Sequence, residues 1–181
     1  MKKQFEQNQS RPELSRRDFV RTVRDSTLLL VLPQFLGCRA QAPSVGETSY
    51  TLKFLLASEA ETVEAITARI FPSDEQPGAP EALVVHFIDH MLATHYRDQQ
   101  NLYREGLSKL DRLSIERFRR RFHNVRVSEQ DLLLSEIEQG LNGEESQMFF
   151  AAIRAHTIQG MFSDPKYFGN RDRVGWQILD I

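Results

Sequence analysis

The sequence has a single cysteine and none of the short motifs that bind common redox cofactors. With one cysteine, Cys38, the chain cannot form an internal disulfide or supply the thiolates of an iron–sulfur cluster. It lacks the Gly-x-Gly-x-x-Gly pattern of dinucleotide sites, the Gly-x-x-x-x-Gly-Lys-Ser/Thr phosphate loop and the Cys-x-x-Cys-His haem motif. We therefore expect no cofactor in this chain, so that any redox chemistry would need a cofactor carried elsewhere.

A long hydrophobic run is also missing. The most apolar stretch, residues 27–37 (TLLLVLPQFLG), is about 17 Å long as a helix, whereas a bilayer core is about 30 Å thick. Pro33 also disfavours a continuous helix through this stretch. The run is too short to span a membrane, which favours the apolar region of an export signal.

Two adjacent arginines precede this run in the pattern of a twin-arginine export signal. The stretch SRRDFVR matches the informative positions of that signal at Ser15, Arg16, Arg17, Phe19, Val20 and Arg21. The alternative is the solvated start of a basic helix, which leaves the following apolar run unexplained. We expect a periplasmic protein that the twin-arginine machinery exports in the folded state.

Cys38 ends the apolar run in the sequence FLGC, which resembles the lipobox of bacterial lipoproteins. Gly37 fits that motif well, but Phe35 and Leu36 fit it poorly. We predict lipidation at Cys38 and a membrane-anchored lipoprotein, and an incidental cysteine remains the alternative. The predicted organisation is a signal peptide over residues 1–37, a flexible tether over 38–51, and a folded domain over 52–181.

The charge balance disfavours a nucleic-acid partner. Removing residues 1–37, with seven basic and four acidic side chains, leaves 144 residues and changes the formal net charge from −2 to −5. Nucleic-acid binding depends on cations that neutralise phosphates. The one basic cluster, RFRRRFHNVR at residues 117–126, is better explained as an amphipathic helix with Phe118 and Phe122 facing the core.

Helical periodicity dominates the rest of the chain and predicts a single compact all-α domain of about five helices. The first expected helix begins at a Ser58/Glu61 capping box and ends before Pro72, and the second runs from about 80 to 96. The third carries Tyr103, Leu107 and Leu110. The fourth begins at Ser128/Asp131 and ends at Gly140, and the fifth runs from about 144 to 161. The apolar and aromatic residues that these helices bear are Val63, Ile66, Ile70, Val84, Phe87, Ile88, Met91, Leu92, Tyr103, Leu107, Leu110, Leu132, Leu133, Leu134, Ile137, Phe149, Phe150, Ile153 and Met161, and most of them are expected to face inward.

The histidines permit a metal-site hypothesis. His86 and His90 lie four residues apart on one helical face, with Asp89 adjacent and His95 further on. A zinc site normally needs three or four ligands, so structural histidines are the preferred interpretation. The pairs Asp89/His90 and Asp111/His156 remain possible acid–base groups, which only geometry can decide.

The C-terminal stretch GMFSDPKYFGNRDRVGWQILDI is rich in glycine and aromatic residues and has no helical period. Together with RIFPSDEQPGAPEA, its segment DPKYFGNRDRVGW resembles the gluconate 2-dehydrogenase subunit 3 family, over residues 56–181. The twin-arginine signal is also similar to the usual N-terminus of that family. The imperfect lipobox is a departure that concerns the mode of anchoring.

The resemblance implies a non-catalytic small subunit of a membrane-associated, flavin-dependent sugar or polyol dehydrogenase. It implies an FAD-binding large subunit that travels with this chain's export signal, and a cytochrome subunit that removes electrons. It brings no catalytic residues. The alternative from another functional class is a free-standing periplasmic lipoprotein enzyme or metal-binding protein that uses His86, His90 and Asp89.

Within the C-terminal stretch, aromatic anchors and arginines suggest a partner-binding surface. The expected binding residues are Tyr167, Phe168, Asn170, Arg171, Arg173 and Trp176. The alternative is that the aromatic side chains only close the base of the helical domain.

Overall fold

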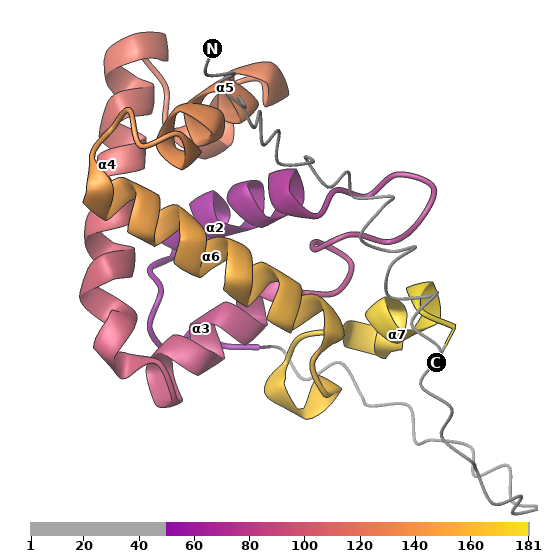
Figure 1. Cartoon of the computed structure of the whole chain (residues 1–181). Helices are drawn as coiled ribbons and strands as arrows, with labels where there is room; N and C mark the ends of the chain where they lie inside the picture. Colours follow the sequence, from indigo (N-terminus) through magenta and orange to yellow (C-terminus); the bar gives the residue numbers. More distant parts are fainter. Residues whose placement is uncertain (1–49, 181) are drawn as a thin grey trace, which may run out of the picture. The chain divides into compact units, whose positions relative to one another are not determined.

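The computed structural model describes residues 50–180, which form one compact helical unit (Figure 1). The predicted signal residues, Cys38 and most of the tether lie outside the described residues. The α-helices are α2 (Ala57–Ile70), α3 (Val84–Thr94), α4 (Gln100–Phe118), α5 (Val127–Glu138), α6 (Glu144–Phe162) and α7 (Val174–Ile178). Short 3-10 turns are η1 (Arg97–Gln99), η2 (Phe122–Asn124), η3 (Pro165–Tyr167) and η4 (Arg171–Arg173). Residues 50–180 contain no strand, so the all-α prediction is confirmed.

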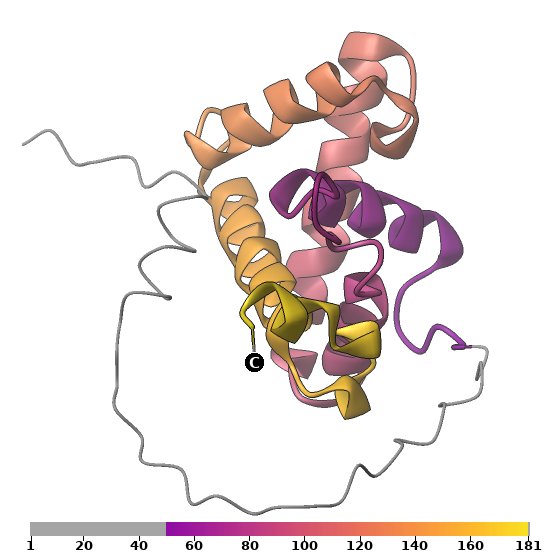
Figure 2. The same ribbon diagram turned by 90° about the vertical axis from the view of Figure 1, so that its right-hand side faces the viewer.

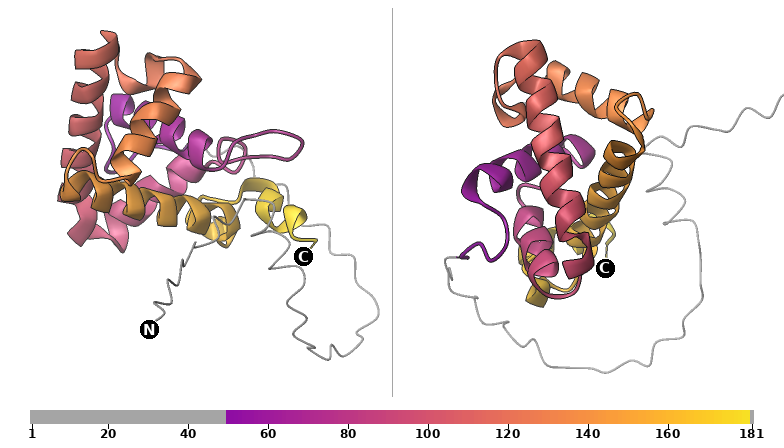
Figure 3. Two further views of the ribbon diagram at one scale, coloured as in Figure 1. Left: turned by 45° about the horizontal axis from the view of Figure 1, so that its top comes forward. Right: turned by 90° about the vertical axis from the view of Figure 1, so that its left-hand side faces the viewer.

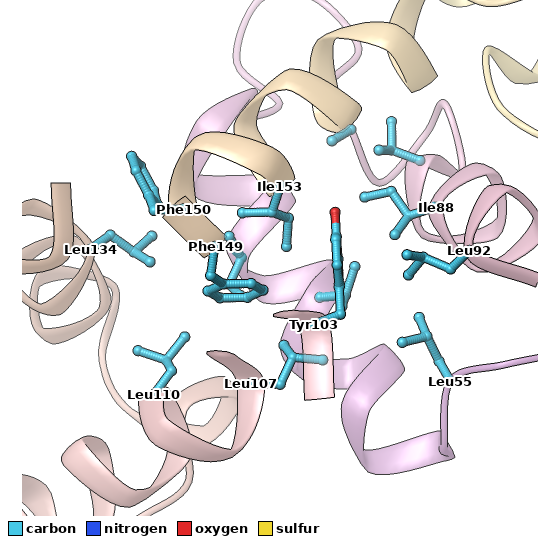
Figure 4. Packing of buried hydrophobic residues seen from close by; sticks show 14 of the residues in the cluster. Leu55, Ile88, Leu92, Tyr103, Leu107, Leu110, Leu134, Phe149, Phe150 and Ile153 are labelled. Carbon is cyan, nitrogen blue, oxygen red and sulfur yellow. The ribbon is translucent and has the colours of Figure 1, made fainter. Parts of the chain in front are cut away.

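Helix α6 packs against every other long helix of the described domain. Figure 4 shows the core where Tyr103 and Leu107 of α4 meet Phe149 and Ile153 of α6. Gly106 permits this crossing, since a Cβ at that position would lie only 2.2 Å from Cγ of Phe149. The predicted inward residues are buried or half-buried, except that Leu132 on α5 is 42% exposed.

Two helix starts differ from the predicted capping boxes. Helix α2 has Leu56 as its N-cap, and the Glu59 carboxylate accepts the Leu56 N–H at 2.8 Å. Helix α5 begins in the same way, with Glu129 accepting the N–H of Arg126 at 2.9 Å. The predictions at Ser58 and Ser128 were wrong because a glutamate three residues after an ordinary N-cap satisfies that backbone donor by itself.

The second predicted helix is shorter than expected. Leu83 has a left-handed backbone, with φ of 52°, and α3 begins only after it, at Val84. The segment before it, residues 79–83, forms hydrogen-bonded turns, including the bond from the Leu83 N–H to the Pro80 carbonyl at 3.1 Å. Pro80 therefore opens a turn rather than the helix.

The basic cluster is not one amphipathic helix. Helix α4 ends at Phe118, and Arg119 closes it with a φ of 63°. The next turn is fixed by side chains, because Asp111 accepts the Phe122 N–H at 3.0 Å and Ser114 donates to the Arg120 carbonyl at 2.9 Å. Phe122 still reaches the core and is fully buried.

The turns η3 and η4 and helix α7 lie at the opposite end of the domain from α5 and the last turn of α4 (Figures 1 and 2). In the right-hand view of Figure 3, α2 crosses behind the middle of α4, and α6 lies to one side of α4. No helix in the described part of the chain is long and apolar enough to cross a bilayer.

Candidate partner interface

The C-terminal turn, residues 164–176, has an unusual concentration of left-handed backbone. Its non-glycine residues with positive φ are Phe168 at 69°, Asn170 at 46°, Asp172 at 53° and Arg173 at 60°. The left-handed region costs an ordinary L-residue roughly 1–2 kcal/mol, and such strain persists only where the surroundings impose it. The turn is therefore held in a defined shape by its contacts.

Asn170 is the residue that fixes this shape. Its side chain is fully buried, and its amide donates to the Ser163 carbonyl at 2.9 Å while its oxygen accepts the Gly175 N–H at 2.8 Å. The neighbouring Arg171 N–H donates to the Ala82 carbonyl at 3.2 Å. Gly175 lies so close to α6 that a Cβ would be 1.9 Å from the Met161 carbonyl oxygen. Asn170 thus shapes the turn from the inside and leaves the surface to other residues.

The other predicted binding residues differ in exposure: two aromatic residues are half-buried, and Phe168 and two arginines are exposed. Trp176 is half-buried and donates its indole N–H to the Phe162 carbonyl at 2.9 Å, which fastens α7 to the end of α6. Tyr167 is also half-buried. Phe168 is 40% exposed, and Arg171 and Arg173 are exposed beside it in the turn. The sequence could not separate these roles, because aromatic and basic residue types serve both.

Phe168 lies within a cluster that the sequence did not reveal. Its ring centroid is 5.1 Å from that of Tyr50 and 4.9 Å from that of His90, and the Lys53 ammonium lies 5.0 Å from the ring centroid. Tyr50 also stacks on His86 at 4.3 Å. We call Tyr50, Lys53, His86, His90 and Phe168 the aromatic cluster. Its members come from three distant parts of the chain, so no local spacing predicts it.

Asp89 fastens the segment that supplies Tyr50 and Lys53. This segment, residues 50–55, is called the strap. Oδ2 of the buried Asp89 accepts the Tyr50 hydroxyl and the Lys53 N–H, each at 2.7 Å. Oδ1 accepts the N–H groups of Phe54 at 2.9 Å and Leu55 at 2.7 Å. Arg104 adds a bond to the Phe54 carbonyl at 2.7 Å, so the strap is held firmly on α3.

These contacts shift the pKa values of Asp89 and Tyr50 in opposite directions. Burial by itself raises the pKa of Asp89, but the hydrogen bonds from Leu55, Tyr50, Lys53 and Phe54 outweigh it, and the pKa lies below its ordinary value. Burial and the bonded Asp89 carboxylate raise the pKa of Tyr50 far above its usual range. Asp89 is therefore an ionised structural anchor, a role that differs from the acid–base role considered from the sequence.

The two histidines of the cluster make aromatic contacts. Burial lowers the pKa of His86 and of His90, and Lys53, whose ammonium is 3.2 Å from Nδ1 of His90, lowers the latter further. Among the described residues, no group of three or more histidine, cysteine or carboxylate side chains is arranged to hold a metal ion. The hypothesis of metal binding at His86 and His90 stays untested.

The other acid–base pair considered from the sequence is also engaged elsewhere. Asp111 accepts the Phe122 N–H, as described above. His156 is buried, its Nδ1 lies 2.7 Å from the Tyr103 hydroxyl, and its ring stacks on Tyr96 at 4.5 Å. Burial lowers the pKa of His156 to about 4. Both residues thus have structural partners of their own.

An open groove of about 540 Å³ lies next to the aromatic cluster, between the end of α3 and the end of α6. Its apolar and aromatic lining consists of Phe87, Met91, Ile158, Phe162 and Tyr167. Ile158 is 38% exposed on the groove wall. His95 and the acidic Asp164 also line the groove. An open apolar groove of this kind is a candidate surface for a partner.

A comparison with models of protein families shows which family the chain belongs to. The family model for gluconate 2-dehydrogenase subunit 3 matches residues 57–180. The chain belongs to this family. The match begins at the first residue of α2 and ends after α7, so it includes the groove and the C-terminal turn but none of the strap. Comparisons with curated proteins and with solved structures give no match.

Proposed function

We propose that this protein is the non-catalytic small subunit of a periplasmic, flavin-dependent sugar or polyol dehydrogenase. It carries the twin-arginine export signal for the FAD-binding large subunit and stabilises that subunit in the complex. The family match over residues 57–180 is the observation that supports this proposal, because the family is named for a subunit of gluconate 2-dehydrogenase. Electrons leave the complex through a cytochrome subunit.

The face around Phe168 is the proposed docking surface for the large subunit. Rigid aromatic side chains dominate binding energy at protein interfaces, and arginines bind carboxylates in a bidentate manner. Phe168 is exposed and held in a left-handed conformation. The Lys53 ammonium lies over the Phe168 ring, and Arg171 and Arg173 are exposed in the same turn, with Arg171 3.6 Å from the Asp172 carboxylate. The complementary surface on the large subunit is an apolar element with acidic residues at its edge.

The docking test is recovery of the large subunit and its flavin with the tagged full chain from cells that make both. Phe168→Ala removes the exposed anchor and should cost about 2 kcal/mol, roughly a thirtyfold loss in affinity. The matched control is Leu141→Ala, since Leu141 is 70% exposed on the turn after α5. Full recovery with Phe168→Ala, or equal loss in both variants, would place the interface elsewhere.

The export role has its own test. Replacing Arg16 and Arg17 by lysine keeps the charge but loses the planar guanidinium group that distinguishes arginine from lysine. We expect both this chain and the large subunit to remain in the cytoplasm of cells that make the double variant. Normal appearance of the large subunit in the periplasm would contradict a shared export signal.

A further inference from the structure

Three consecutive arginines stand at the turn that follows α4, at the end of the domain remote from the docking surface (Figures 1 and 2). Arg119, Arg120 and Arg121, here called the arginine tip, are all exposed. We propose that the arginine tip binds the surface of lipid bilayers that contain anionic headgroups. This inference does not depend on the proposed function.

Hydrogen bonds to side chains of α4 fix the backbone of the arginine tip. Ser114 holds the Arg120 carbonyl and Asp111 holds the Phe122 N–H, at 2.9 and 3.0 Å. Phe122 is fully buried directly after the tip, and Gln130 donates to its carbonyl at 3.1 Å. The three cations are thereby displayed together without the entropic cost of ordering a loose loop.

Nearby acidic groups are largely engaged by other partners. Glu136 pairs with Arg117 at 2.6 Å, Glu129 with Arg126 at 2.6 Å, and Asp131 with Arg69 at 2.7 Å. Glu61 lies 3.3 Å from His123, whose ring carries a charge only when it is protonated. None of the three tip arginines forms an ion pair with a carboxylate of residues 50–180. Glu116 is exposed close by in the chain, and so is Arg112. The Asp111 carboxylate, which accepts the Phe122 N–H, also lies at the tip, and Arg120 interacts electrostatically with Glu129. The three arginines outnumber Glu116 and Asp111, so the tip keeps a net positive charge.

Exposed apolar side chains lie before and after the arginine tip in the chain. Ile115, whose carbonyl accepts the Arg119 N–H at 2.9 Å, is 43% exposed, and Val127, the first residue of α5, is 54% exposed. Basic residues next to exposed aliphatic ones suit the boundary between headgroups and acyl chains. A nucleic acid would need cations that follow a backbone over several phosphates, whereas these three are confined to one turn.

A local probe separates binding at the tip from binding elsewhere on the chain. We would label the full chain at Asn124→Cys with an environment-sensitive dye, with Cys38→Ser to remove the native thiol. Asn124 is exposed and its N–H donates to the Arg121 carbonyl at 2.9 Å. A second labelled protein with Gln177→Cys reports on the opposite end. The probes are vesicles of phosphatidylcholine with and without phosphatidylglycerol.

We expect the label at residue 124 to respond only to the phosphatidylglycerol vesicles and to lose that response at high salt. Changing all three tip arginines to glutamine should raise the half-saturating lipid concentration about a hundredfold, since each basic residue near an anionic surface contributes roughly a fivefold factor. Lysine at the three positions should preserve binding, which separates loss of charge from misfolding. Arg171→Gln with Arg173→Gln is the control at the other end.

Two results would overturn the proposal. One is a label at residue 124 that responds equally to vesicles with and without phosphatidylglycerol, or equally in the glutamine and wild-type proteins. The other is a stronger response of this label to duplex DNA than to the anionic vesicles at the same salt concentration, which would assign the tip to nucleic acid.

Discussion

Replacing Asp89 by asparagine should destabilise the domain more than any exposed carboxylate replacement, because Asp89 accepts four hydrogen bonds from the strap. If the asparagine oxygen takes the place of Oδ1, its NH2 group faces the Lys53 N–H, which cannot reverse its role as a donor. The Tyr50 hydroxyl can rotate to accept. One half-buried N–H loses its acceptor, and the bonds to Phe54 and Leu55 lose their charge assistance. The combined cost is about 3 kcal/mol.

The assay is urea unfolding of the full chain followed by circular dichroism at neutral pH. Asp98→Asn is the matched control, because Asp98 is exposed on η1. Hydrogen exchange should also show faster exchange at the Lys53 and Leu55 amides in Asp89→Asn. Equal free energies of unfolding for the two variants would refute the reasoning, since the strap would then not depend on the Asp89 carboxylate.

The pH dependence of Asp89 has a definite sign. Its pKa is lower in the folded than in the unfolded chain, whose ordinary value is 3.8, so its contribution to stability is present above that value and is lost as the pH falls through the folded pKa. Asp89→Asn should lose this part of the acid sensitivity. If the free energies of unfolding of the wild-type protein and of Asp89→Asn fell in parallel as the pH decreased, folding would not lower the pKa of Asp89.

Three other predictions concern the core, a buried histidine and the lipid anchor. Gly106→Ala should cost about 1–3 kcal/mol in urea unfolding by forcing a methyl group into Phe149, and wild-type stability of this variant would contradict the close crossing. The pKa of His156 is about 4 in the folded chain and 6.5 in the unfolded chain. The free energy of unfolding should therefore fall by about 3 kcal/mol as the pH falls from 6.5 to 4, because the unfolded chain gains a proton that the buried ring does not. Unfolding at a series of pH values, with His156→Gln as the reference, tests this. Intact mass of the mature protein should show acyl chains at Cys38, and an unmodified thiol would favour a soluble subunit.

The sequence predicted what depends on local repetition. The helix from about 144 to 161 agrees with α6, Glu144–Phe162, since its apolar residues recur at the helical period and Gly143 precedes it. Phe149 and Ile153 are fully or almost fully buried there, as predicted. The residue at which each helix begins was less predictable, because Glu59 and Glu129 cap helices whose N-cap residues have no capping side chain.

The candidate interface was predictable only in part, because its geometry depends on contacts distant in sequence. The turn composition pointed to Phe168 and Arg171, which are exposed as a binding surface requires. The same composition suggested Asn170, whose buried hydrogen bonds within the turn only the structure reveals. Lys53 lies 36 residues before Asp89 in the chain, and no periodicity links the two.

The position of the strap relates the two proposed roles, export and docking of the large subunit. The strap is the first described part of the domain after the segment predicted to carry the export signal, and Tyr50 and Lys53 place it against Phe168. A large subunit docked on Phe168 would therefore also contact the strap, with which the described part of the chain begins. Since Asp89 seats the strap only when α3 is folded, the complete docking surface would exist only in the folded subunit. This order suits an export route that carries folded proteins, because the flavin-loaded partner would join a chain that is already ready for transport.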